Sequence, residues 1–312
     1  MKRVILTGGT GMLGIALIEL LIQKDIEVLV IVRPNSKRRQ AIPVDRHVQV
    51  IECDLTELSS LKRRLTKTYD TFFHFAWDGT YGEARNDMQL QNRNVKAVLD
   101  AVDLAKAVGC QTFLGAGSQA EYGRVDGVKL SPDTPVHPET GYGIGKLCAG
   151  QMSRIQCHQL GMKHIWVRIL STYGPHDGLH TMVMSGIIQM LHGERPKYTK
   201  GEQMWDYLYC ADAARAFYLA ADRGKDGSVY CIGSGQVRPL AEYITIIRDT
   251  IDKNIEIGLG EIPYYDKQVM YLCADIGNLT KDTGFRPEIS FEEGVRRTVE
   301  WYKEEMKNEE DN

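Results

Sequence analysis

The sequence predicts an α/β fold in which helices cover both faces of a parallel sheet. Short segments rich in β-branched and aromatic residues alternate with longer helical patterns through the first two thirds of the chain. The strand candidates are almost continuously apolar, as parallel strands buried on both faces require. A glycine-rich turn joins the first strand candidate to the first helix candidate, which is typical of doubly wound sheets that bind dinucleotides.

Six segments are expected to form the strands of this sheet. They are Val4–Thr7, Val28–Val32, Val48–Glu52, Thr71–Phe75, Thr112–Leu114 and Ile165–Ile169. Helical segments lie between them. The apolar residues of Met12–Gln23 recur at helical spacing, and a second helix is expected over Val95–Val108.

The turn after the first strand candidate carries glycines at positions 8, 11 and 14. Gly8 permits a tight turn, Gly11 permits the close approach of a pyrophosphate, and Gly14 lets the helix pack on the strand. The phosphates would meet free N–H groups at the helix N-terminus. The predicted cofactor loop consists of Gly8, Thr10, Gly11, Met12, Leu13 and Gly14.

Arg33, just after the second strand candidate, bears on the choice between NAD and NADP. An acidic residue near this position would hold the ribose 2′-hydroxyl of NAD, whereas an arginine suits the 2′-phosphate of NADP. Arg38 and Arg39 can assist, and the alternative is a solvated basic loop. NADP(H) is favoured, and NAD(H) is possible. The same site is expected to include Asp54 and Leu55 at the adenine, Ala76 after the fourth strand and Ile169.

The regular alternation ends near residue 170, where Gly174, Pro175 and Gly178 interrupt the pattern. Later helices are expected at Thr181–Leu191, Asp212–Ala221, Leu240–Ile251 and Phe291–Lys303. The chain is thus interpreted as a Rossmann-type dinucleotide-binding domain over residues 1–170 and a smaller, partly interleaved α/β substrate domain over residues 171–312. Residues 203–232 are expected to pack back on the first domain.

The composition is that of a soluble globular protein. Of 312 residues, 43% are hydrophobic and 25% are charged, and the net charge of −3 offers no electrostatic basis for binding nucleic acid or an anionic membrane. No apolar run approaches the ~20 residues that span a bilayer. Neither a signal peptide nor a metal site is expected. The seven cysteines include no CxxC pair, which indicates buried free thiols and a cytoplasmic location.

Tyr142 and Lys146 stand four residues apart, so on a helix both project from the same face. An ammonium close to a phenol favours the phenolate, which predicts a Tyr142 pKa below its usual value of about 10. A phenol tuned in this way can exchange a proton with a carbinol or carbonyl oxygen. Beside a nicotinamide, that is half of an alcohol–ketone interconversion.

Ser118 follows the fifth strand candidate, at the sheet edge where open α/β folds bind ligands. Together with the glycine loop, Tyr142 and Lys146, it makes the chain resemble the extended short-chain dehydrogenase/reductases from residue 1 to about 303. Further matches are Asn94-Val95, Pro135–Pro138, Arg168 through Pro175, Asp206–Tyr209, Gly233–Gly235 and Gly284–Pro287.

The resemblance implies a role for each matching residue. Tyr142 would be the general acid/base, Lys146 would hold the nicotinamide ribose and support the phenolate, and Ser118 would hydrogen-bond the reacting oxygen. Asn94 would fix the active-site backbone and a water molecule. The resemblance also implies a homodimer and a small-molecule substrate linked to a nucleotide.

Three reactions occur in this family: 4,6-dehydration, epimerisation and carbonyl reduction. Dehydratases of the family carry Asp-Glu directly after the catalytic hydroxyl residue, where this chain has Gln119 and Ala120, so dehydration is not expected. Epimerases recycle a tightly held NAD, whereas reductases draw on NADPH, and Arg33 therefore favours a reductase. Gly117–Gly123 and Gly201–Tyr207 resemble the nucleotide-sugar 4-ketoreductase branch related to CDP-abequose synthase.

The substrate side departs from the family pattern. Trp205 stands where many members have an arginine that binds the diphosphate, and no arginine occurs in Ile262–Lys267. Lys267, Arg238 or Arg195 can substitute, and Trp205 and Tyr207 can stack on a base or sugar. Glu121 would either contact a sugar hydroxyl or form a structural ion pair. The predicted substrate residues are Trp77, Gln119, Glu121, Thr172, Trp205, Tyr207 and Arg238.

The sequence thus leads to three hypotheses about function. The favoured one is an NADP(H)-dependent carbonyl reductase that acts on a nucleotide-linked 4-keto sugar through Ser118, Tyr142 and Lys146. The alternative is a nucleotide-sugar 4-epimerase with tightly bound NAD. A different class, a non-catalytic dinucleotide-sensing scaffold, is disfavoured because both Tyr142 and Lys146 are present.

Overall fold

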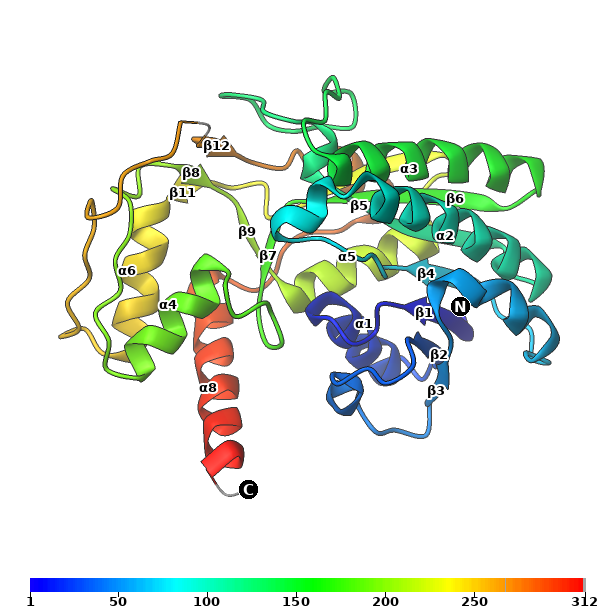
Figure 1. The fold of residues 1–312 in the computed structure, drawn as a ribbon, viewed down its shortest axis with the longest axis horizontal. Coiled ribbons are helices and arrows are strands. Elements are labelled where there is room, and N and C mark those ends of the chain that lie inside the picture. Colours follow the sequence, from blue (N-terminus) through cyan, green and yellow to red (C-terminus); the bar gives the residue numbers. More distant parts are fainter. Residues whose placement is uncertain (267, 311–312) are drawn as a thin grey trace.

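The computed structural model describes residues 1–266 and 268–310. Its centre is a seven-stranded parallel sheet in the order β10-β6-β5-β4-β1-β2-β3 (Figure 1). The strands are β1 (Arg3–Thr7), β2 (Glu27–Val32), β3 (Val48–Glu52), β4 (Thr71–His74), β5 (Thr112–Ser118), β6 (Lys163–Ile169) and β10 (Ser228–Ile232). The strand order reverses between β1 and β4, and such a reversal opens a crevice at the carboxyl edge of the sheet.

Helices cover both faces of the sheet, and alternate residues of each strand point to opposite cores. Ile5 and Phe72 pack in one core with α2 (Met88–Ala107) and α3 (Gly141–Gln159). Leu6 and Phe73, their neighbours in the chain, pack in the other core with α1 (Met12–Gln23) and α5 (Cys210–Arg223). The α/β prediction is therefore confirmed.

The remaining elements form a smaller group beside the sheet (Figure 1). One small sheet has the order β11 (Arg238–Pro239), β8 (Met204–Trp205), β12 (Tyr271–Leu272), and another pairs β7 (Ser171–Tyr173) with β9 (Tyr207–Tyr209). The helices α4 (Met182–Leu191), α6 (Leu240–Ile251) and α8 (Phe291–Glu310) pack around them. Two later segments return to the large sheet: β10 is one of its strands, and α7 (Gly277–Thr283) packs against β10 and α5.

The predicted element bounds agree with the structure where a local signal is strong, as for Met12–Gln23, Val48–Glu52 and Leu240–Ile251. Strand β5 continues past the predicted end at Leu114 and ends at Ser118. The prediction stopped early because the strand contains glycines, which have a low propensity for strands. Helix α2 begins at Met88, seven residues before the predicted Val95. It begins there because the Asp87 carboxylate caps the helix by accepting hydrogen bonds from two N–H groups of its first turn. Within the described residues, four 3₁₀ segments connect the elements: η1 (Arg39–Ala41), η2 (Leu55–Arg63), η3 (Gly82–Asn86) and η4 (Gln119–Glu121).

The cysteines are all free thiols, and every one except Cys148 is buried, as the sequence predicts. Among residues 1–266 and 268–310, no helix combines the length and the apolar character needed to cross a membrane.

Candidate active site

The carboxyl end of β5 and the first turns of α3 bring together three of the four predicted catalytic residues, Ser118, Tyr142 and Lys146. Ser118 ends β5, and Thr140 caps α3 by accepting a hydrogen bond from Gly143 N at 3.1 Å, which starts the helix one residue before Tyr142. Lys146 follows one turn later on the same helix. The arrangement places two hydroxyl groups and one amino group close to the carboxyl edge of the sheet. We call the region formed by Ser118, Tyr142 and Lys146 the catalytic corner.

The environment of the Tyr142 phenol differs from the predicted one. Burial raises the Tyr142 pKa above its usual value, although a hydrogen bond with Ser118 and the positive charge of Arg85 lower it. The expected decrease caused by Lys146 is therefore wrong for this structure. The reason is burial, which outweighs these effects; the Lys146 Nζ lies 5.8 Å from the centre of the Tyr142 ring, and with a pKa of about 7 it is mostly uncharged where a phenol titrates.

Lys146 is held by other partners. Its Nζ donates a hydrogen bond of 2.6 Å to the carbonyl of Ala116 in β5 and lies 3.9 Å from the centre of the Trp77 ring. Burial lowers the Lys146 pKa to about 7, and Glu121 opposes that change. A lysine titrating near neutral pH, beside two hydroxyls at a sheet edge, is a candidate functional group.

Helix α2 fixes the loop that follows β4. The Asn94 side chain accepts a hydrogen bond from Asp78 N at 3.1 Å and donates one to the Asp78 carbonyl at 2.8 Å. Trp77 donates from Nε1 to Gln91 at 2.7 Å, and its ring packs edge-on against Tyr142. Asn94 thus holds the backbone of the loop that follows β4, and Trp77 connects this loop to Tyr142.

The glycine loop has the form that a dinucleotide requires. Gly8 has a φ of +77°, and a Cβ on Gly14 would lie 2.3 Å from the Gly8 carbonyl oxygen. A Cβ on Gly11 would instead project into space, with its nearest neighbour 3.7 Å away. Helix α1 has neither a capping side chain nor an acidic residue in its first turn, within the part of the chain described. Its first N–H groups therefore suit an anion.

The predicted adenine-side residues gather at the same edge. The Arg33 guanidinium is 71% exposed and 3.9 Å from the Asp78 carboxylate. Arg38 donates to the His176 carbonyl at 2.7 Å, and Arg39 pairs with Glu52 at 2.6 Å. Arg33 therefore has the loosest contact of the three arginines.

The remaining cofactor candidates have backbone or capping contacts at this edge. The Asp54 carboxylate caps η2 by accepting from Thr56 N, which leaves Leu55 as the first residue of that segment. Ala76 N donates to the Thr7 hydroxyl at 3.3 Å, beside Gly8. Ile169 lies opposite Ser118 in the β5–β6 register.

Four of the seven substrate candidates, Thr172, Trp205, Tyr207 and Arg238, lie on β7, β8, β9 and β11. Trp205 donates from Nε1 to the Ser171 hydroxyl at 2.8 Å, next to the half-buried Thr172. Tyr207 lies in an aromatic cluster with its ring 5.1 Å from that of Tyr243. Arg238, opposite Trp205 in the β11–β8 pair, forms an ion pair of 2.6 Å with Glu292.

Two further candidates for binding a diphosphate are Arg195 and Lys267. Arg195 forms ion pairs with Glu261 and Glu256, and Lys267 lies outside the described residues. The buried Gln119 amide oxygen has no hydrogen-bond partner among the described residues, which is compatible with a ligand contact. In residues 1–266 and 268–310, no group of three or more His, Cys, Asp or Glu side chains is placed to hold a metal ion.

Glu121 does not face the substrate. The residue is completely buried, and its carboxylate pairs with Arg168 at 2.7 Å, so of the two expected roles the structure shows the ion pair. Sequence reasoning also missed Arg85, whose guanidinium lies 4.6 Å from the centre of the Tyr142 ring. No local motif marks Arg85, because it comes from η3, a segment far from Tyr142 in the chain.

The chain is similar in sequence to two dTDP-glucose 4,6-dehydratases. A dTDP-glucose 4,6-dehydratase from Salmonella typhimurium is 28% identical over 180 residues, which cover 54% of this chain and only about half, 49%, of that protein. A dTDP-glucose 4,6-dehydratase from Haemophilus influenzae is 23% identical over 97% of this chain and 98% of its own length.

Solved structures share the whole fold. A UDP-N-acetylglucosamine 4-epimerase from Methanobrevibacter ruminantium, in complex with UDP-N-acetylmuramic acid, has a TM-score of 0.88 and 24% identity, covering 98% of this chain and 99% of that one. A dTDP-glucose 4,6-dehydratase from Streptomyces venezuelae with NAD bound has a TM-score of 0.84 and 21% identity, covering 97% of each chain. The sequence model of the NAD-dependent epimerase/dehydratase family matches residues 4–233. The chain therefore belongs to this family of extended short-chain dehydrogenase/reductases.

Proposed function

We propose that the protein is an NADP(H)-dependent reductase of a nucleotide-linked 4-keto sugar. The observation that carries the proposal is the convergence of Ser118, at the end of β5, with Tyr142 and Lys146, on the first turns of α3, at the edge where the glycine loop offers free N–H groups. A dinucleotide on that loop would supply hydride to a carbonyl carbon. Ser118 would donate a hydrogen bond to the carbonyl oxygen, and Tyr142 would transfer its hydroxyl proton to the same oxygen.

The raised Tyr142 pKa suits the reductive direction. A phenol that holds its proton at neutral pH is ready to act as an acid on the oxygen that becomes negative as hydride arrives. The proton lost from Tyr142 would leave a phenolate, which the Arg85 guanidinium stabilises electrostatically from 4.6 Å. Lys146 would hold the nicotinamide ribose through N–H groups not used by the Ala116 carbonyl.

Dehydration, the reaction named for the Salmonella and Haemophilus relatives, is not proposed for this chain. Elimination of water needs an additional acid and base next to Ser118. Gln119 and Ala120 occupy η4 directly after Ser118, and neither side chain transfers a proton at neutral pH. The buried Glu121 carboxylate, which is tied to Arg168, does not replace them.

Arg33 supports NADP(H) over NAD(H). Its exposed guanidinium at the end of β2 can form bidentate hydrogen bonds with a 2′-phosphate, which carries two negative charges near neutral pH. The nearby Asp78 carboxylate reduces this positive potential. That contact is the observation in favour of a second candidate, a 4-epimerase with retained NAD, since the same Ser118, Tyr142 and Lys146 would serve both reactions.

Turnover assays separate these functions. We expect the purified protein to oxidise NADPH stoichiometrically when UDP-, dTDP- and CDP-linked 4-keto sugars are supplied as a panel. We expect Tyr142→Phe to lower kcat by about 10²- to 10⁴-fold while dinucleotide affinity, measured by calorimetry, stays unchanged. Interconversion of 4-epimers without net NADPH oxidation would establish the epimerase. Dinucleotide binding with no turnover on any member of the panel would favour the sensing scaffold.

A further inference from the structure

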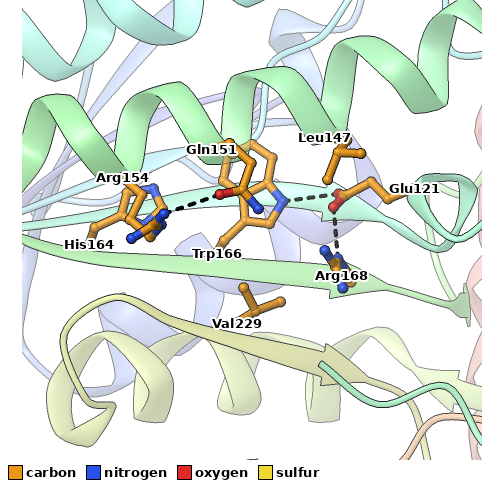
Figure 2. Close-up of a pocket in the computed structure, with 9 residues that line it drawn as sticks. Glu121, Leu147, Gln151, Arg154, His164, Trp166, Arg168 and Val229 are labelled. Atoms are coloured by element: carbon orange, nitrogen blue, oxygen red, sulfur yellow. Dashed lines mark hydrogen bonds and ion pairs between the residues drawn. The ribbon is translucent and has the colours of Figure 1, made fainter. Parts of the chain in front are cut away.

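A buried cluster of polar side chains lies directly behind the catalytic corner, between α3 and β6 (Figure 2). At its centre is the Glu121 carboxylate. Oε1 accepts hydrogen bonds from Ser118 N at 2.8 Å and from Trp166 Nε1 at 2.9 Å. Oε2 accepts one from Arg168 Nε at 2.7 Å, and Arg168 itself is only 3% exposed. We call Glu121, Trp166 and Arg168 the brace.

The space for the Trp166 indole is made by three glycines on two different elements. A Cβ on Gly115 or Gly117 of β5 would lie 2.3 Å from an atom of the indole, and one on Gly150 of α3 would lie 2.7 Å away. A contact below about 3 Å between heavy atoms of this kind is strongly repulsive. The indole therefore lies tightly between β5 and α3, and it determines how closely they approach.

These two elements carry the residues proposed to act on the carbonyl oxygen and the nicotinamide ribose. Strand β5 supplies Ser118 and the Ala116 carbonyl that holds Lys146, whereas α3 supplies Tyr142 and Lys146. The brace also fixes Ser118 individually. The Glu121 carboxylate holds its N–H, and the Ser118 hydroxyl accepts a hydrogen bond from Ala120 N at 3.1 Å, which leaves the hydroxyl proton to be donated elsewhere.

We propose that Glu121, held in place by Trp166 and Arg168, is a positioning residue that fixes the Ser118 hydroxyl against Tyr142 and sets the spacing of β5 and α3. This inference deepens the proposed function and rests on it for the role of Ser118. A carboxylate that touches neither the reacting atoms nor the solvent thereby controls the geometry of two residues that do. Small losses of such geometry are costly, because a displacement of about 1 Å can slow a reaction on the order of 100-fold.

The charge of Glu121 offers a separate readout. The charged and titratable groups that face Tyr142 are Arg85 of η3, Glu121 of η4, Lys146 of its own helix and Tyr81 of the loop before η3. Among them, Glu121 raises the pKa of Tyr142, and it also raises that of Lys146. Removal of this one carboxylate is thus expected to move both titrations to lower pH.

The first test uses Glu121→Gln combined with Arg168→Met, which removes the buried ion pair without leaving one charge unpaired. We expect the Tyr142 phenol to titrate at lower pH than in the unmodified protein. Ultraviolet difference spectroscopy measures this when each protein is compared with its own Tyr142→Phe counterpart, and it requires no substrate. The result is therefore independent of whether the reductase assignment holds. An unchanged Tyr142 titration in a folded double variant would overturn the electrostatic part of the proposal.

The second test concerns geometry. Trp166→Phe keeps an aromatic ring between the glycines but removes the N–H that holds Glu121. We expect this variant to fold even if the Glu121→Gln/Arg168→Met double variant fails to fold. We expect hydrogen exchange of the Ser118 amide to accelerate and kcat to fall about 10- to 100-fold with KM and dinucleotide affinity unchanged. Gln151→Ala is the control, because Gln151 lines the same cavity but its side-chain oxygen accepts its hydrogen bond from Arg154, which is not part of the brace. Unchanged Ser118 exchange in Trp166→Phe, or an equal effect of Gln151→Ala, would refute the positioning role.

Discussion

Lys146 provides a quantitative test of how thoroughly the catalytic corner is buried. Its side chain is 4% exposed, and burial lowers its pKa from the ordinary value of 10.5 to about 7. The unfolded chain therefore binds a proton that the folded protein lacks between those two pH values. The free energy of unfolding should rise with pH across this window, because stability increases wherever the unfolded state binds more protons.

The magnitude follows from the two pKa values. Each unit of difference corresponds to about 1.4 kcal/mol, so Lys146 alone should add roughly 3 kcal/mol to the free energy of unfolding from about pH 6 to about pH 9. His74, buried nearby, contributes mainly below its ordinary pKa of 6.5, because burial lowers its own pKa to about 3; its contribution to this window is confined to the lower end. Removal of the ammonium in Lys146→Met should abolish the increase.

Urea denaturation of the protein and of Lys146→Met at a series of pH values measures this effect. Other titrating groups affect both proteins alike, so the difference between the two free energies of unfolding isolates Lys146. The lost hydrogen bond to the Ala116 carbonyl shifts this difference by a constant and leaves its pH dependence unaltered. A difference that stays within about 0.5 kcal/mol from pH 6 to pH 9 would show that the ammonium is solvated and would refute the reasoning.

Two further predictions concern the cofactor. Arg33→Asp should shift the ratio of NADPH to NADH affinities by about 10-fold or more towards NADH, because it replaces a cation by an anion beside the 2′-phosphate. Calorimetric titration with both dinucleotides measures this ratio, and an unchanged ratio would contradict the role of Arg33. Gly14→Ala should weaken dinucleotide binding about 100-fold or more, since its Cβ would lie 2.3 Å from the Gly8 carbonyl oxygen. Gly11→Ala is its matched comparison: its Cβ has 3.7 Å of clearance within the protein, so a loss there reports on the ligand instead.

Local features of the sequence were sufficient to predict much of the fold. The apolar runs of β1 to β4 and the helical spacing of Met12–Gln23 are short-range patterns, and each agrees with the structure within a residue or two. Strand β5 was underestimated because Gly115 and Gly117 lack the side chains that indicate a strand. Those same glycines make room for Trp166, a contact that local patterns do not predict.

What the sequence by itself determined is the glycine turn, the alternation that gives the parallel sheet and the placing of Tyr142 and Lys146 on one helix face, because each depends on patterns of neighbouring residues; Ser118 joined that set through the family resemblance. Only the tertiary structure decided what surrounds those residues. The Glu121 carboxylate is buried and paired because Arg168 and Trp166, both on β6, bind it. The Tyr142 pKa is raised because packing removes water from the phenol. Burial and charge at a site depend on residues distant in the chain, and folding alone brings them together.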